Sequence, residues 1–126
     1  MVIMKCIQHL FNNAMMKMNY HGWSLNIKPG HDSYCWIGSH RIDLGIAYTG
    51  DIRQILLHEI AHIGTARFCN QKHNSQFWKH LEDLIWYWLK QPLDTNQLRH
   101  KQSTGDGIYA ICYDHSIVHK GELEIT

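Results

Sequence analysis

The stretch Ile52–Phe68, IRQILLHEIAHIGTARF, decides the fold class of this chain. Its residues are mostly apolar, which is typical of a helix that is buried on most of its sides. Asp51 stands directly before it as a good N-cap, and Gln54 follows three residues later. The sequence therefore predicts a buried helix that begins at Ile52.

Inside this helix stands His58-Glu59-Ile60-Ala61-His62, which has the pattern H-E-x-x-H. Residues four apart lie on one face of a helix about one turn from each other, so both imidazoles can bind one metal ion. Zinc binds neutral nitrogen donors at about 2.0–2.1 Å, and histidine supplies them at neutral pH. Because two histidines and a glutamate are costly to bury without partners, their place in an apolar helix favours a zinc site. Glu59 is expected to hold a metal-bound water and accept its proton.

A third ligand has to come from further along the chain. Metzincins have a histidine shortly after this motif, but position 68 is Phe. Glu82 follows His62 by 20 residues, which is the spacing of a gluzincin ligand. However, Glu82 lies about 110° from the centre of the apolar face of its helix, so we expect it to be solvated beside Lys79. His73, at the start of the next helix, is the better candidate for the third ligand.

A helix and three short strands are predicted before the metal helix. Apolar residues at helical spacing predict an amphipathic helix over residues 2–18, which His21-Gly22 ends. Alternating apolar residues predict strands near 23–27, 34–37 and 41–46. We expect a short, mainly antiparallel sheet in which 41–46 is an edge strand, so that an extended peptide can pair with it through main-chain hydrogen bonds.

Another helix is predicted after the loop at 69–74, where Asn74 or Ser75 can act as its cap. Pro92 ends it. Its apolar face consists of Phe77, Leu81, Leu84, Ile85 and Trp88. The pattern is weaker in the C-terminal extension, 93–126, where 108–113 resembles a strand.

Length and composition limit the function classes. A chain of 126 residues is about one domain, and an apolar share of 44% is enough for a core. We expect one α+β domain over 1–126, with its core at about 1–92. The 12 Lys and Arg residues nearly balance the 11 Asp and Glu residues, which gives little support to nucleic acid as a partner. The chain shows no apolar run that could span a membrane and no signal-peptide core, so we expect a cytoplasmic protein without a membrane partner.

The cysteines are widely spaced and form no C-x-x-C pair: Cys6, Cys35, Cys69 and Cys112. We therefore expect free thiols in a reduced compartment. The segment Cys112-x-x-His115-x-x-x-His119 has a metal-like spacing and could form a second site with Cys69. We interpret it as a lone cysteine and two surface histidines, because no fourth ligand is close in the sequence.

The sequence HEIAH, a short loop and then H-N-S-x-F-W-x-x-L resembles the SprT-like and WLM zinc metallopeptidases. The matching residues are His58, Glu59, His62, His73, Phe77, Trp78 and Leu81. The resemblance covers roughly residues 1–90 and implies a small zincin-like domain, in which a helix and a sheet precede the metal helix. The cysteine ribbon that many SprT proteins carry at the C-terminus is absent from this sequence.

The resemblance implies a zinc ion (Zn2+) held by His58, His62 and His73, and hydrolysis of peptide bonds in a protein or peptide substrate. In that mechanism a zinc-bound water attacks the carbonyl, and Glu59 acts as the general base. A donor to the oxyanion is expected as well. The candidates, which the sequence does not rank, are Tyr109, Tyr113, His100 and His115.

An alternative class of function is a catalytically weak or inactive binding or accessory module that zinc stabilises, with nucleic acid as one kind of partner. Glu59 distinguishes the two classes, because a purely structural site has no need of an acidic residue there. Structural zinc is also usually enclosed by four protein ligands. The sequence therefore favours the enzyme.

Overall fold

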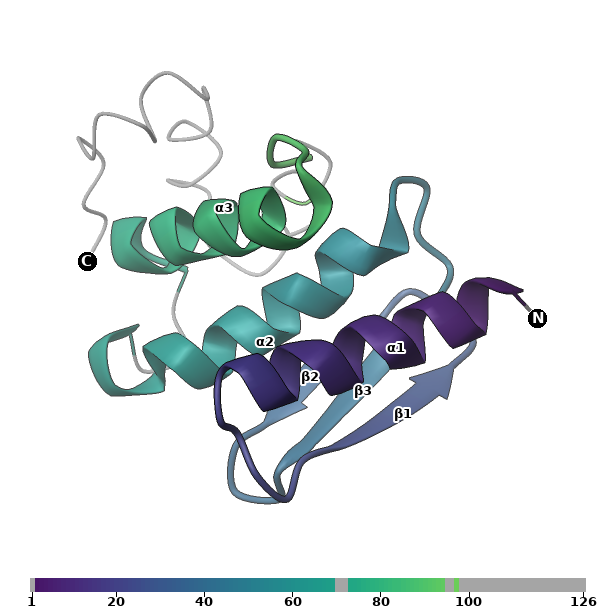
Figure 1. The fold of residues 1–126 in the computed structure, drawn as a ribbon, viewed down its shortest axis with the longest axis horizontal. Coiled ribbons are helices and arrows are strands. Elements are labelled where there is room, and N and C mark those ends of the chain that lie inside the picture. Colours follow the sequence, from purple (N-terminus) through teal and green to yellow (C-terminus); the bar gives the residue numbers. More distant parts are fainter. Residues whose placement is uncertain (1, 70–72, 95–96, 98–126) are drawn as a thin grey trace. The chain divides into compact units, whose positions relative to one another are not determined.

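The computed structural model describes residues 2–69, 73–94 and 97. The chain divides between Ile60 and Ala61 into two compact units, and each is described separately below (Figure 1). Helix α2 (Ile52–Cys69) runs through this boundary. Several predictions lie outside the described residues: the strand at 108–113, the four oxyanion candidates, and the group of Cys112, His115 and His119.

The first unit begins with α1 (Val2–Lys17), as the apolar spacing predicts. The described buried residues of α1 are Ile7, Leu10, Phe11, Ala14 and Met15. The helix ends before His21-Gly22, because Asn19 takes a left-handed conformation with a φ of 59°. The N–H of Tyr20 then donates to the carbonyl of Met15 at 2.9 Å. Asn is one of the few residues that adopt this conformation readily, so it ends the helix in place of a glycine.

The sheet of the first unit has the strand order β1-β3-β2. Strand β1 (Ser24–Lys28) pairs in parallel with β3 (Arg41–Gly45), and β2 (Tyr34–Trp36) pairs with β3 in the antiparallel direction. The prediction of a mainly antiparallel sheet is therefore wrong, since the longer pairing is the parallel one. The prediction that 41–46 is an edge strand is also wrong, because β3 lies in the centre and β2 lies at an edge.

The loop at 29–33 explains this strand order. It carries the chain from the end of β1, past the end of β3, to the start of β2. A Cβ atom on Gly45 would lie 2.5 Å from the carbonyl oxygen of Asp32 and 2.8 Å from that of Gly30. In addition, the N–H of Gly45 donates to Ser33 Oγ at 2.9 Å. The crossing depends on a position without a side chain, which the alternation within β3 does not reveal.

The two faces of the sheet differ in burial. Ile42 and Leu44 are fully buried on one face, and α1 lies along the sheet in Figure 1. Because side chains alternate along a strand, Asp43 points to the opposite face. Tyr34 pairs with Asp43, and Trp36 pairs with Arg41, so these residues share that second face. We call it the outer face, since Tyr34 and Trp36 are each 44% exposed.

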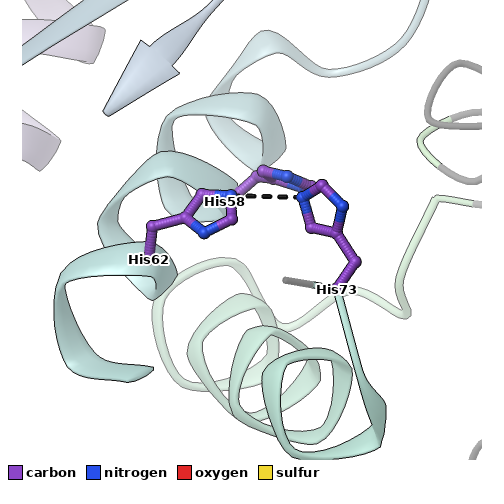
Figure 2. A group of neighbouring side chains, drawn as sticks. All are labelled: His58, His62 and His73. Atoms are coloured by element: carbon purple, nitrogen blue, oxygen red, sulfur yellow. Dashed lines mark hydrogen bonds between the residues drawn. The ribbon is translucent and has the colours of Figure 1, made fainter. Parts of the chain in front are cut away.

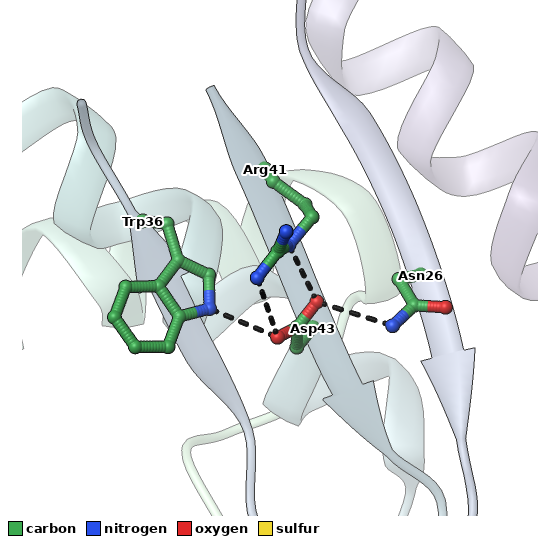
Figure 3. Close-up of polar contacts among 4 residues, drawn as sticks. All are labelled: Asn26, Trp36, Arg41 and Asp43. Atoms are coloured by element: carbon green, nitrogen blue, oxygen red, sulfur yellow. Dashed lines mark hydrogen bonds and ion pairs between the residues drawn. The ribbon is translucent and has the colours of Figure 1, made fainter. Parts of the chain in front are cut away.

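Asp43 is a buried carboxylate on the outer face (Figure 3). It accepts hydrogen bonds from Trp36 Nε1 at 2.9 Å, Asn26 Nδ2 at 3.3 Å and Arg41 Nε at 3.0 Å. Burial is the largest influence on the pKa of Asp43 and raises it. The hydrogen bonds from Trp36, Asn26 and Arg41, together with the charge of Arg41, outweigh burial and lower the pKa below its ordinary value.

Helix α2 begins at Ile52, as predicted. The N–H of Arg53 donates to Asp51 Oδ1 at 3.0 Å, which satisfies one of the amide groups that a helix leaves without an internal partner. Residues 54–62 are all buried, so the predicted burial on most sides is confirmed for this part of the helix.

In the second unit, α3 (Ser75–Leu89) is capped by Asn74, whose side chain accepts the N–H of Phe77 at 3.0 Å. The helix ends at Lys90, which is left-handed with a φ of 56°, two residues before Pro92. In the part of the chain that the structure describes, no helix is long and apolar enough to cross a membrane.

Candidate metal centre

Three buried histidines converge on one point: His58, His62 and His73 (Figure 2). Each offers one ring nitrogen, and these three atoms lie within 4.8 Å of one another. The Nε2 atoms of His62 and His73 are 3.2 Å apart. Two ligands that lie 2.0–2.1 Å from a tetrahedral ion are about 3.3–3.4 Å apart. The spacing and the nitrogen donors therefore fit a shared metal ion, and the cluster joins all three residues that the sequence predicted as ligands.

Helix α2 supplies two of the three imidazoles. His58 and His62 stand one turn apart on the same continuous helix, so helix geometry alone holds their rings on one face. Both lie in the completely buried segment 54–62. Packing on every side restricts the rotamers of a buried side chain, which keeps both rings close to the position where a ligand is needed.

His73 is held by the residues that follow it. Trp78 Nε1 donates to the carbonyl of His73 at 3.0 Å, and Asn74 fixes the first turn of α3. The ring of Phe77 lies 4.5 Å from that of His62 and 4.9 Å from that of His73, measured between centroids. The helical spacing predicts Phe77 on the apolar face of the helix, whereas its contact with both imidazoles was not predicted. A phenyl ring four residues after a predicted ligand is the signal that could have indicated it.

Glu59 and Cys35 both belong to the first unit, and the charge of Glu59 acts on the Cys35 thiol. Glu59 is 2% exposed and directly follows His58 in α2. Burial, and then the charge of Glu59, raise the pKa of the Cys35 thiol to about 12. Cys35 therefore stays protonated near neutral pH and is a poor ligand and nucleophile. Cys35 is the central residue of β2, so the charge of Glu59 acts on this edge strand.

The prediction that Glu82 is solvated is wrong. Glu82 is only 9% exposed, and it lines a pocket of about 360 Å³ together with Trp86, Pro92 and Leu93. The angle of Glu82 on its own helix could not predict this, because the segment after α3 returns to that side. Glu82 does not belong to the histidine cluster.

Comparisons of the chain with family models, curated proteins and solved structures find no match. The resemblance to SprT-like and WLM peptidases therefore stays a prediction that depends on the motif residues. The described part of the chain is a small α+β structure with three helices and a three-stranded mixed sheet. Cys6 and Cys35 have free thiols, as expected.

Proposed function

We propose that this protein is a zinc-dependent metallopeptidase with a zincin-like active site. The observation that carries the proposal is the convergence of His58, His62 and His73, together with the burial of Glu59, which directly follows His58 in the chain. The H-E-x-x-H pattern supports the role of general base for Glu59.

The donor set supports zinc. Three neutral imidazoles suit zinc better than calcium or magnesium, which prefer oxygen ligands. A set of three protein ligands is typical of catalytic zinc, whereas structural zinc usually has four. When bound, the ion would lower the pKa of a water molecule to about 7 and polarise the carbonyl group of the substrate.

Glu59 supplies the proton transfer in this proposal. Its carboxylate accepts a proton from the attacking water and then delivers it to the leaving amine. Because Glu59 is buried, packing rather than solvent fixes the position of its side chain. A base that is already in place reduces the cost of orienting it during the reaction.

The edge of β2 supports a peptide as the substrate. Among the described strands β2 pairs with β3 alone, so an extended peptide can add a strand along its other side. The charge of Glu59 acts on Cys35, the central residue of this strand. A peptide on this edge would have its backbone near the proposed general base.

The variant Glu59→Gln tests the proposal. It removes the base but keeps the shape and the three ligands, so we expect unchanged zinc content and a loss of about 10²- to 10⁴-fold in cleavage of an unfolded protein. The matched control is Glu82→Gln, a buried glutamate outside the histidine cluster, which should cleave normally. Unchanged cleavage by Glu59→Gln would remove Glu59 from this role. Absence of cleavage by the zinc-loaded natural chain would favour a zinc-stabilised binding module instead.

A further inference from the structure

Two large aromatic side chains, Tyr34 and Trp36, are exposed on the outer face of the sheet, on the edge strand β2. Their ring centroids are 5.4 Å apart. Tyr34 and Trp36 are separated by one residue, so both point to the same face of the strand. Cys35, between them, points to the opposite face.

Polar side chains contact both rings, and Figure 3 shows those around Trp36. The indole N–H of Trp36 is bonded to the buried carboxylate of Asp43, and the guanidinium of Arg41 lies 5.8 Å from the Trp36 ring centroid. Lys28 Nζ lies 5.2 Å from the centroid of Tyr34. Aromatic rings that are already ordered lose little conformational freedom on binding, which makes them effective contact residues.

We propose that Tyr34 and Trp36 select the substrate, favouring peptides with large apolar or aromatic side chains at two positions separated by one residue. The inference rests on the proposed function, because it takes the edge of β2 as the place of the substrate backbone. A peptide that pairs with β2 has its own side chains in alternation. Those on the outer face lie opposite Tyr34 and Trp36, with Cβ atoms about 4.5–5.5 Å apart in directly opposed pairs.

The charges at the outer face add a second preference. Lys28 and Arg41 both lie against the rings, and Asp43 pairs with Arg41. A lysine or arginine of the substrate at these positions would face a like charge at Lys28. We therefore expect the order of affinity Phe, then Ser, then Lys at the two outward positions.

A peptide fits this surface better than single-stranded nucleic acid, the other ligand that exposed rings and cations can bind. A nucleic-acid surface needs several unpaired cations along the backbone path, whereas Arg41 is paired with Asp43. Only a peptide can also use the main-chain edge of β2.

Binding of labelled peptides to the full-length, zinc-loaded Glu59→Gln protein tests the inference without turnover. Three ten-residue peptides would differ only at two alternate positions, occupied by Phe, Ser or Lys. We expect the Phe peptide to bind about tenfold more tightly than the Ser peptide, and Trp36→Ala to remove that advantage. The matched control is Trp86→Ala, since Trp86 is 60% exposed on α3 and should not affect binding.

Two further variants separate recognition from folding. Trp36→Phe keeps a ring but loses the bond to Asp43, and it should retain most of the preference for Phe. Tyr34→Ala leaves Asp43 and its partners intact and should reduce the preference even if Trp36→Ala does not fold.

Equal affinity for the three peptides would overturn the inference. It would also be overturned if the natural chain binds oligothymidylate and Trp36→Ala loses that binding but not peptide binding. If selectivity is absent while the natural chain cleaves protein, the inference fails and the proposed function stands. Selective binding without any cleavage by the natural chain supports the recognition surface and contradicts the proposed function.

Discussion

Asp43 and the histidine cluster are both buried polar groups, but their surroundings differ in kind. Asp43 is an acceptor surrounded by donors, because Trp36, Asn26 and Arg41 all direct N–H groups at it. The histidine cluster brings together three groups of one kind, each with a ring nitrogen directed at a common centre. The chain itself supplies the donors that surround Asp43, whereas the three convergent imidazoles have the nitrogen atoms that a metal ion binds.

The surroundings of the polar groups distinguish a structural polar cluster from a ligand site. Donors and acceptors that match within the chain stabilise the fold and need nothing from outside. Neutral imidazole nitrogens that converge can hydrogen-bond to one another, as His62 and His73 do, but their lone pairs can also bind a metal ion. Removal of the metal and removal of the Asp43 carboxylate should therefore have different effects on stability, which the following experiments can measure.

Metal removal should have the largest effect. At a zinc concentration a thousandfold above its dissociation constant, binding to the folded state adds about 4 kcal/mol to the free energy of unfolding. We expect a chelator to remove this stabilisation from the natural chain and to have no effect on His62→Ala. Thermal unfolding with and without zinc measures it.

The choice of third ligand is tested in the same series. His73→Ala should lose at least about a hundredfold in zinc affinity, because one of three ligands is gone. Glu82→Ala should bind one equivalent of zinc, as the natural chain does. The opposite result, zinc lost only in Glu82→Ala, would assign the third ligand to Glu82.

Asp43→Asn should have an intermediate effect, a loss of about 1–3 kcal/mol in the free energy of unfolding at pH 7, because an NH2 donor replaces one of the two buried oxygens that accept hydrogen bonds. The pKa of Asp43 is lowered in the folded state, so its contribution is fully present above the unfolded value of about 3.9. The contribution is lost as the pH falls through the lower folded value. Urea unfolding from pH 7 to pH 3 should show the two proteins converging at the acid end.

The control for this prediction is Asp83→Asn, the same substitution in an exposed pair. Lys79 Nζ and Asp83 Oδ1 are 2.8 Å apart, but both side chains are exposed. Exposed pairs contribute about 0.2–1 kcal/mol, so Asp83→Asn should change stability little. A similar loss in both variants would show that burial of Asp43 has no special effect.

Asn74→Ala should have the smallest effect on stability, about 1 kcal/mol, because it removes the N-cap of α3. It should also weaken zinc binding, since the cap fixes the turn that follows His73. Asn74→Ser keeps a capping oxygen and should restore both properties. Calorimetry for stability and zinc titration for affinity measure the two effects, and a stability loss with unchanged affinity would separate the cap from the site.

Local patterns were enough to predict most elements. The 3.6-residue spacing located all three described helices, and alternation located the three strands within one or two residues. The spacing of His58 and His62 placed two imidazoles on one helix face for the same reason. His73 was also found locally, through its place just before a capped helix.

Features that depend on distant parts of the chain could not be predicted. The central place of β3 results from the loop at 29–33, which alternation within the strand does not describe. Glu82 is buried because residues after α3 cover it, and no property of α3 alone indicates that.

The end of α1 has a local cause. Asn19, rather than a glycine, ends α1 because its side chain tolerates the left-handed conformation.

The absence of a side chain at Gly45 affects more than the end of β3. Since the backbone of Asp32 occupies the space where a methyl group would stand, the missing side chain is what lets the loop cross at that level. The crossing in turn delivers Cys35 and its neighbours to the side of the sheet near Glu59. One hydrogen atom in place of a carbon thus lets β2, and not β3, take this edge of the sheet.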